Sequence, residues 1–410
     1  MTPATLTQCA VLVGGLGTRL GTRTANTPKP ILPCGDRPFL AWQLRELVRF
    51  GVTEFLLLTG YLSTEVEKTA QDILGALPRE ARITISEEPV RAGTGGAIYY
   101  ARDRLDQRFL LCNGDSLLDC NLANLLAKAA TDPETVTGRM LLRQLDDASR
   151  FGVARLDGDR ITGFKARPPD GTGGIINAGI YVFRRSLVDF LSPQCSMEAD
   201  ILPQLAAAGA LRGTLGDGYF RDIGTPEDFA RAQAEIPRQL RRRAVFFDRD
   251  GVLNIDHGYV GTRERFEWMP GALEAIRYVT DARWHVFVVT NQSGVARGHY
   301  DEAAVRQLLE WMADEARRAG GTIDDVRYCP FHESAVVDGY QRSSNWRKPE
   351  PGMLLDLIRT WELDPKRCVM IGDQATDMAA AAAAGVPGHL FSGGNLLEFV
   401  RRILPPQQSV

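Results

Sequence analysis

The sequence predicts an α/β protein of two successive domains, each a mostly parallel sheet with helices on both faces. The chain has 410 residues, which is more than one ordinary domain needs. Short apolar runs alternate with helical patterns along it, and this alternation is typical of parallel sheets. A second series of such runs begins at Arg243, the last residue of the basic segment PRQLRRR. We therefore expect one domain over residues 1–238 and another over residues 239–410.

The individual elements follow from the hydrophobic pattern, because continuous apolar runs suit buried strands and helical spacing suits amphipathic helices. In the first domain we expect strands over residues 9–13, 54–59, 82–86 and 109–112, and helices over residues 39–50 and 65–74. In the second domain we expect strands over 244–247, 285–289 and 368–371, and helices over 272–280 and 301–319. Six consecutive alanines at 379–384 also indicate a helix, one that packs closely on a sheet.

Composition and charge give no support for binding to nucleic acid or to a membrane. The net charge is -3, and no apolar run reaches the length of a membrane span. The first residues lack the basic and apolar regions of a signal peptide. The seven cysteines are scattered and odd in number, which argues against a disulfide framework and for a reducing cytoplasm. We expect small-molecule partners and a cytoplasmic location, and the sequence leaves open whether the chain forms a homo-oligomer.

Three glycines follow closely on the first expected strand: Gly14, Gly15 and Gly17. Glycines let the backbone approach a phosphate chain and point its amide groups inward. A plain tight turn would also explain them, whereas a dinucleotide-binding loop would need a third glycine where Leu20 stands. Two cations, Arg19 and Lys29, come next and suit a pentacoordinate phosphorus that gathers negative charge. We expect both cations to be catalytic.

The segments GGLGTRL and TPKPILP resemble the signature of sugar nucleotidyltransferases, especially the mannose- and heptose-1-phosphate guanylyltransferase branch. The resemblance covers roughly residues 8–235 and implies a Rossmann-like domain with a GT-A-like mixed sheet. It also implies magnesium held by two carboxylates, Asp115 of NGD and Asp222 of RDIGTPED. The segment SMEADILP is typical of the family as well. By the same resemblance the nucleotide, the sugar and its phosphate would be bound by Gly14, Gly15, Gly17, Gly93, Thr94, Asn113, Arg167 and Asn177.

One segment departs from this family. The family usually has Glu-Lys-Pro where this chain has Ala166, Arg167 and Pro168. Arg167 can contact a sugar phosphate bidentately, but Ala166 cannot replace a carboxylate that holds a sugar hydroxyl. Lys165 reaches the same region. The sugar selected by this half of the chain is therefore open, and a nucleotide-sugar-binding module without turnover is an alternative.

A second set of candidate residues begins with DRDG at the end of a four-residue apolar strand, where ligands bind in open α/β sheets. Asp248 is placed to attack phosphorus and form an aspartyl-phosphate. Asp250 can protonate the leaving alcohol and later take a proton from water. An acidic turn would explain DRDG alone. Three further motifs follow in order: Thr290 and Asn291 in VVTNQSG, Lys348 in WRKPEPGM, and Asp373 and Asp377 in VMIGDQATD.

These four motifs resemble the haloacid dehalogenase superfamily, and DRDGVLN, TNQSGVARG and RKPEPGM resemble its histidinol-phosphate and heptose-bisphosphate phosphatase branch. The resemblance covers about residues 244–400 and implies a second Rossmann-like, doubly wound domain. It implies magnesium held by the side chains of Asp248 and Asp373 and the backbone carbonyl of Asp250, with Asp377 in an outer position. The phosphoryl group or the substrate would be bound by Thr290, Asn291, Arg347 and Lys348.

Only about 40 residues separate the first two motifs, which leaves no room for a helical cap domain. We therefore expect a capless phosphatase with an open site, whose specificity depends on loops near residues 256–267 and 331–346. The branch usually carries a zinc loop, but this chain keeps only Cys329 and His332 and has Ser344 and Trp346 in place of two cysteines. Two ligands do not close a structural zinc site, so no zinc is expected. A smaller departure is Gln374, where the heptose enzymes are expected to have lysine.

Together the two resemblances imply two steps of one pathway. The phosphatase must spare the anomeric phosphate that the transferase consumes, so the expected substrate is a sugar bisphosphate. The family pairing points to D-glycero-D-manno-heptose 1,7-bisphosphate, dephosphorylated at carbon 7. The heptose 1-phosphate would then take GMP from GTP, giving GDP-heptose and pyrophosphate. Mannose or another hexose phosphate, or histidinol phosphate for the second domain, are the alternatives.

Overall fold

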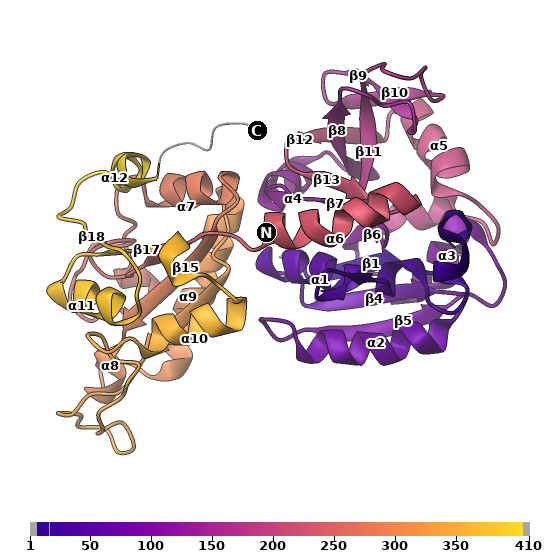
Figure 1. Cartoon of the computed structure of the whole chain (residues 1–410). Helices are drawn as coiled ribbons and strands as arrows, with labels where there is room; N and C mark the ends of the chain where they lie inside the picture. The colour runs from indigo at the N-terminus through magenta and orange to yellow at the C-terminus, as the bar shows by residue number, and fades with distance from the viewer. Residues whose placement is uncertain (1–5, 16, 405–410) are drawn as a thin grey trace. The chain divides into compact units, whose positions relative to one another are not determined.

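The computed structural model describes residues 6–15 and 17–404, and the chain divides into two compact units, Met1–Leu240 and Arg241–Val410. The ends of both predicted domains, residues 1–5 and 405–410, lie outside the described residues, and so does Leu16 in the glycine-rich loop. Figure 1 shows the first unit in indigo to rose and the second in orange to yellow. Within the described part of the chain, no helix combines the length and the apolar character that crossing a membrane requires.

The first unit contains a mixed nine-stranded sheet. Its strand order is β5-β4-β1-β6-β11-β8-β12-β10-β9. The first four strands are parallel, and they are β5 (Arg82–Glu87), β4 (Glu54–Thr59), β1 (Gln8–Leu12) and β6 (Arg108–Asn113). The other five are β11 (Gly174–Arg184), β8 (Gly138–Leu145), β12 (Leu211–Gly216), β10 (Arg160–Lys165) and β9 (Val153–Asp157). Because β11 runs antiparallel to both β6 and β8, the sheet is mixed, as predicted.

Helices cover both faces of this sheet. Successive residues of a strand point to opposite faces, and in β1 Cys9 and Val11 join one apolar core while Ala10 joins another. The first core includes α1 (Phe39–Arg49), α2 (Ser63–Gly75) and α4 (Leu122–Thr131). The second includes α3 (Gly93–Tyr100) and α5 (Leu202–Ala207). The last helix of the unit, α6 (Pro226–Leu240), packs on a smaller core with α1.

Two short antiparallel ribbons accompany the large sheet. One joins β2 (Pro33–Cys34) to β3 (Arg37–Pro38). The other joins β7 (Ser116–Leu118) to β13 (Phe220–Asp222), and its register places Ser116 opposite Asp222. Two segments that are about a hundred residues apart in the chain therefore meet directly beyond the end of β6. No hydrophobic pattern predicted this ribbon, because strands of two or three residues are too short to show one.

The second unit contains a parallel five-stranded sheet. Its order is β16 (Asp325–Cys329), β15 (His285–Asn291), β14 (Ala244–Phe247), β17 (Cys368–Gly372) and β18 (Gly388–Leu390). One face packs on α7 (Ala272–Asp281), α9 (Glu302–Arg318) and α12 (Leu396–Ile403). The other packs on α10 (Gly352–Trp361) and α11 (Ala375–Ala383). This arrangement confirms the predicted doubly wound sheet, and the buried Ala380 and Ala381 of α11 confirm the close packing expected of the alanine run.

The second unit carries no helical cap between its first two strands. Residues 248–284, all of them described, contain the short 3-10 helix η6 (Arg263–Arg265) and the sheet-covering helix α7, and are otherwise loop. The predicted capless architecture is therefore confirmed. The short helix α8 (Ser293–Ala296) follows β15 directly.

Candidate active sites

The first group of candidate residues in the second unit gathers at the carboxyl ends of three neighbouring parallel strands. Asp248 follows β14, Thr290 and Asn291 end β15, and Asp373 follows β17. The backbone N–H of Asp248 donates to the carbonyl of Ile371 at 2.9 Å, so the sheet ladder itself fixes where the Asp248 side chain begins. Because the three strands are parallel, their carboxyl ends lie at one edge of the sheet. The motif residues at these ends therefore lie close together in space, although they are far apart in the sequence.

Lys348 crosses over this strand edge from the segment before α10. Its ammonium lies 2.7 Å from Oδ1 of Asp248 and 2.7 Å from Oδ1 of Asp377, and it donates to the carbonyl of Val289 at 3.0 Å. Two backbone–side-chain hydrogen bonds to Asn291 hold its main chain. Lys348 is only 3% exposed. Burial lowers its pKa, but the two carboxylates outweigh this effect and raise the pKa above its ordinary value, so the side chain remains a cation.

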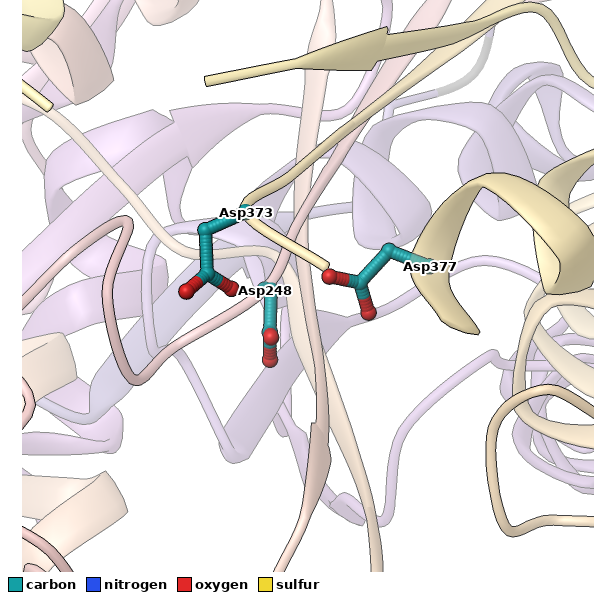
Figure 2. A group of neighbouring side chains, drawn as sticks. All are labelled: Asp248, Asp373 and Asp377. Atoms are coloured by element: carbon teal, nitrogen blue, oxygen red, sulfur yellow. The ribbon is translucent and has the colours of Figure 1, made fainter. Parts of the chain in front are cut away.

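Three carboxylates lie close together at this strand edge, next to Lys348. Oxygens of Asp248, Asp373 and Asp377 lie within 4.8 Å of one another, and Figure 2 shows the three side chains gathered around Asp248. Burial raises the pKa of Asp248 and of Asp373, and the neighbouring charge of Asp377 raises both further. Oδ1 of Asp373 is buried without a hydrogen-bond partner in the described residues. A hard divalent cation with oxygen ligands fits such a set of donors.

Whereas the hydrogen-bond and ion-pair contacts of Asp248 within the described residues are both at Oδ1, Asp377 has contacts at both of its carboxylate oxygens. Besides its ion pair with Lys348, its Oδ2 accepts the backbone N–H of Gln374 at 3.0 Å, which closes the first turn of α11. These contacts leave Asp377 fewer free lone pairs than Asp373 has. Its position therefore suits a residue that orients Lys348 and the loop after β17.

Replacing Asp377 with alanine is expected to lower the free energy of unfolding of this unit by about 3 kcal/mol, because one partner of a buried cation is removed. Asp377→Asn keeps an acceptor for the Gln374 N–H and should lose less. Denaturant unfolding followed by tryptophan fluorescence measures the effect, since every tryptophan except Trp42 lies in this unit. A loss in Asp377→Ala no greater than in the surface variant Glu310→Gln would contradict the structural role.

Asp250 is held by a network that the motifs did not reveal. The fully buried guanidinium of Arg249 donates to both carboxylate oxygens of Asp250 at 2.7 Å. Gln292 and Asn254 each donate to it at 3.1 Å, and Tyr300 donates in turn to Gln292. In the sequence, the only sign of this network was that its residues lie near the motifs DRDG and TNQSG. The network fixes the carboxylate of a residue that was predicted to carry protons.

The cavity at this strand edge has a volume of about 200 Å³ and takes in most of the predicted residues. Its lining is Asp248, Asp250, Asp256, Thr290, Asn291, Lys348, Asp373, Gln374, Thr376 and Asp377. Arg347 is not among the lining residues, and its guanidinium contacts the carbonyl of Phe331 at 3.5 Å. Asp256 belongs to one of the two loops that were expected to decide specificity, and it does line the cavity.

The positions at which the resembled phosphatase branch carries a zinc loop make other contacts in this chain. Nδ1 of His332 accepts the backbone N–H of Ser334 at 2.9 Å, and its Nε2 lies 3.4 Å from the Arg297 guanidinium. The Ser344 hydroxyl accepts the backbone N–H of Trp346. Trp346 packs against the apolar core that contains the buried Cys329. Hydrogen bonds and packing therefore hold this loop.

The glycine-rich loop of the first unit borders a cavity of about 370 Å³. The predicted residues on its wall are Gly14, Gly15, Lys29, Gly93, Thr94, Asn113 and Asp115. Gly17 is not on this wall. It has a φ of 61°, and its carbonyl accepts the Leu20 N–H and the Thr24 hydroxyl. Gly17 therefore shapes the turn after the loop, whereas Gly14 and Gly15 face the cavity.

Asp115 and Asp222 meet where the β7–β13 ribbon joins the end of β6. The hydroxyl of Ser116 lies between them, 3.2 Å from Asp115 and 3.1 Å from Asp222. Lys29 forms an ion pair with Oδ2 of Asp115, and the N–H of Gly224 donates to Asp222 at 2.7 Å. Burial raises the pKa of Asp222, and the charge of Asp115 raises it further. Two converging carboxylates beside a hydroxyl and a lysine suit a divalent cation and the phosphates it binds.

A larger cavity of about 740 Å³ shares Asn113, Asp115 and Glu198 with the smaller one. The remaining predicted residues of this unit line it: Arg19, Arg167, Asn177 and Asp222, together with Lys165 and Ala166. Arg19 and Lys29, which were predicted to act together, thus lie on different cavities. The shared residues mark the place where ligands in the two cavities would meet.

Glu198 is a candidate residue that the motifs did not assign. It belongs to a π-helical turn, η5 (Met197–Ile201), that is anchored by the hydrogen bond from the Met197 N–H to the Thr94 hydroxyl. Burial raises the pKa of its carboxyl, and the charges of Asp115 and Asp222 raise it further. Its exposed surface opens on both cavities. The signal was present in the segment SMEADILP, but nothing in the sequence said which acid of that segment faces the site.

Comparison with known proteins bears on both units. Residues 9–239, more than half of the chain, match the Nucleotidyl transferase family, and residues 345–398 match the HAD-hydrolase-like family. Over 168 residues the chain is 51% identical to the D-glycero-beta-D-manno-heptose-1,7-bisphosphate 7-phosphatase of Rhodopseudomonas palustris, covering 41% of this chain and 93% of that protein. The Escherichia coli K12 protein of the same name is 41% identical over 143 residues, which is 35% of this chain and 75% of that protein.

Among solved structures, HddC from Yersinia pseudotuberculosis is similar to this chain with 26% identity and a TM-score of 0.49. The match covers 56% of this chain and 99% of that one. The same protein has also been solved in complex with GMP-PN, with the same identity and TM-score.

Proposed function

This chain belongs to the nucleotidyl transferase family, and its second unit belongs to the family of the Rhodopseudomonas phosphatase; we propose on this premise that it catalyses two consecutive steps of nucleotide-sugar synthesis. Residues 239–410 remove the phosphate at carbon 7 of D-glycero-D-manno-heptose 1,7-bisphosphate. Residues 1–238 then join the heptose 1-phosphate to GMP from GTP, giving GDP-heptose and pyrophosphate. The odd number and scattered positions of the seven cysteines favour action in the cytoplasm.

In the phosphatase step, a carboxylate oxygen of Asp248 attacks phosphorus, and the bond from phosphorus to the sugar oxygen breaks. Asp250 gives its proton to the departing sugar oxygen. Water then attacks the aspartyl-phosphate, Asp250 takes the proton from that water, and phosphate leaves with Asp248 restored. Lys348 neutralises the phosphoryl oxygens from 2.7 Å beside the nucleophile, and Thr290 and Asn291 bind them from the end of β15.

In the transfer step, an oxygen of the anomeric phosphate attacks the α-phosphorus of GTP, and pyrophosphate leaves with the electron pair of the broken bond. The smaller cavity, with Gly14, Gly15 and Lys29, holds the nucleotide. The larger cavity holds the sugar phosphate, with Arg19 and Arg167 facing its charge. The reacting atoms then meet beside the shared Asp115.

The donors at both sites fit magnesium, a hard cation that prefers oxygen ligands. Asp248, Asp373 and the backbone carbonyl of Asp250 would hold it in the second unit, and Asp115 and Asp222 in the first. The unpartnered oxygen of Asp373 and the converging carboxylates of Asp115 and Asp222 support this assignment. Bound magnesium supplies charge neutralisation and a fixed position for the phosphates.

Support for a two-step enzyme comes above all from one observation, that each unit brings the separate motifs of its family together at one site. In the second unit four sequence motifs converge within one cavity. In the first unit the glycine loop, the lysine and two acids from distant segments do so as well.

A one-pot assay tests the proposal. The full chain is given heptose 1,7-bisphosphate, magnesium and GTP, and phosphate, pyrophosphate and nucleotide-sugar are followed by mass spectrometry. We expect phosphate release first and GDP-heptose afterwards, and expect EDTA to stop both until magnesium is restored. Phosphate without nucleotide-sugar would leave a phosphatase joined to a binding module. Failure on the heptose while mannose phosphates or histidinol phosphate react would refute the substrate assignment.

A further inference from the structure

A buried glutamine in the second unit connects two groups that the phosphatase step uses for different purposes. Gln292 directly follows β15 and is only 1% exposed. Its Nε2 donates to Oδ2 of Asp250 at 3.1 Å and to the hydroxyl of Thr290 at 2.8 Å. In the proposed reaction Asp250 carries the protons, and Thr290 binds the phosphoryl group. The two N–H groups of one amide therefore hold the proton carrier and the phosphoryl-binding hydroxyl in a fixed arrangement.

A primary amide can do this in only one orientation, because one of its ends donates hydrogen bonds and the other end only accepts them. If the Gln292 amide were reversed, its oxygen would face the Asp250 carboxylate, and both N–H bonds would be lost. The main chain does not prevent this reversal. The Gln292 backbone N–H donates to the carbonyl of Cys329 at 2.8 Å, which fixes the backbone but leaves the side-chain torsions free. A donor to the amide oxygen is needed to select the orientation.

Tyr300 supplies this donor. Its hydroxyl donates to Oε1 of Gln292 at 3.0 Å, and this oxygen accepts no other hydrogen bond from the described residues. Burial raises the pKa of Tyr300 to about 12, so the hydroxyl keeps its proton at neutral pH. Tyr300 therefore selects the orientation in which the Gln292 amide presents its nitrogen to the active site.

The fold holds the Tyr300 ring in a slot that two glycines leave open. A Cβ built on Gly261 would lie 2.0 Å from the ring, and one built on Gly294 would lie 2.2 Å from it. Atoms in a close-packed protein do not approach one another so closely, so neither position can take a larger residue while the ring stays in place. Gly294 belongs to α8, and Gly261 belongs to the loop over residues 256–267 that was expected to decide specificity. Two separate segments therefore make room for the same ring.

We infer that Tyr300 is a positioning residue of the phosphatase step, and that it holds the Asp250 carboxylate in its reacting position through the Gln292 amide. This inference rests on the phosphatase reaction proposed above. Tyr300 does not line the cavity, so it acts on the reaction only through Gln292. Without the hydroxyl, the amide rotates between orientations, and Asp250 is less often placed to give its proton to the departing sugar oxygen.

Two phosphate esters with different leaving groups test this role in the full chain. Heptose 1,7-bisphosphate needs a proton on its departing oxygen, whereas 4-nitrophenyl phosphate releases an anion that is stable without one. In Tyr300→Phe the ring still fills its slot, and kcat/KM should fall about tenfold for the sugar ester but at most about threefold for the aryl ester. The control Tyr278→Phe removes a hydroxyl that donates to the Leu404 carbonyl in the same unit, and it should match wild type on both esters.

A double variant tests the route of the effect. Gln292→Leu removes the amide but keeps a side chain of similar size, and kcat/KM for the sugar ester should fall about 100-fold. Adding Tyr300→Phe to Gln292→Leu should cause no further loss, because a hydroxyl that acts only through the amide then has nothing to orient. Losses that multiply in the double variant would overturn the proposal. An equal loss on both esters in Tyr300→Phe would overturn it as well, since a folding defect acts on every substrate alike.

Crystal structures of wild type and Tyr300→Phe examine the same role without turnover. In the variant, the Gln292 nitrogen should no longer lie within hydrogen-bond distance of both Asp250 and Thr290, and an unmoved amide would overturn the proposal. If wild type hydrolyses neither ester, the proposed phosphatase function fails, while this comparison still decides what holds the amide. If wild type hydrolyses another alcohol phosphate instead of the heptose, that compound replaces the sugar ester in the kinetic test.

Discussion

Replacing Asp248 with asparagine is expected to lower phosphate release about 10⁴-fold or more, because an amide cannot form the acyl phosphate that the first step requires. Asparagine has the same shape and can still accept a hydrogen bond from Lys348, which keeps its second partner Asp377. The fold should therefore survive. Phosphate release from heptose 1,7-bisphosphate, followed at saturating substrate, measures the effect.

The two activities of the chain provide an internal control for this variant. With heptose 1-phosphate supplied, Asp248→Asn should form GDP-heptose at the wild-type rate, because the transferase site contains no residue of the second unit among those described. With the bisphosphate supplied, it should accumulate neither phosphate nor GDP-heptose. The exposed Glu310 lies on α9 of the same unit, and Glu310→Gln should match wild type in both reactions. Phosphate release by Asp248→Asn within tenfold of wild type would rule out Asp248 as the nucleophile.

Replacing Asp115 with alanine is expected to lower nucleotidyl transfer about 10³-fold, with phosphate release unchanged. The substitution removes a candidate metal ligand and also the ion-pair partner of Lys29. It further removes one of the two carboxylates that Ser116 contacts. Pyrophosphate release from GTP and heptose 1-phosphate measures the loss.

A second variant separates a metal ligand from a residue that only positions Lys29. Asp115→Asn keeps a hydrogen-bond acceptor for the lysine but binds a cation more weakly, so the magnesium concentration for half-maximal rate should rise about tenfold or more. Asp170→Ala, which changes an exposed acid of the same unit that lines neither cavity, should leave rate and metal dependence unchanged. A full loss of rate in Asp115→Asn with an unaltered magnesium dependence would assign Asp115 to Lys29 alone.

Much of this molecule could be predicted from its sequence because the relevant signals are local. The buried strands are continuous apolar runs, and the predicted strand over 54–59 coincides with β4. The order of the motifs placed Asp248, Thr290 and Asp373 at the ends of strands of one parallel sheet, and such strand ends share an edge. The distance between the first two motifs excluded a cap, since about 40 residues cannot build one.

Other features depended on contacts between segments that are far apart in the chain. The β7–β13 ribbon was not predicted, yet its register is what brings Asp222 to Asp115. Gly17 belongs to the same glycine-rich segment as Gly14 and Gly15, but only the latter two border a cavity. Nothing in the sequence showed that Glu198 is the acid of SMEADILP that lines both cavities.

By itself, then, the sequence determined the two α/β units, the two chemistries and the residues that carry charge at each site, because hydrophobic period and motif spacing are properties of short segments. Only the tertiary structure decided which of those residues meet, and that Arg19 and Lys29 face different cavities. The physical reason is that strand register and loop packing set distances between side chains, and these arise when segments a hundred residues apart come together.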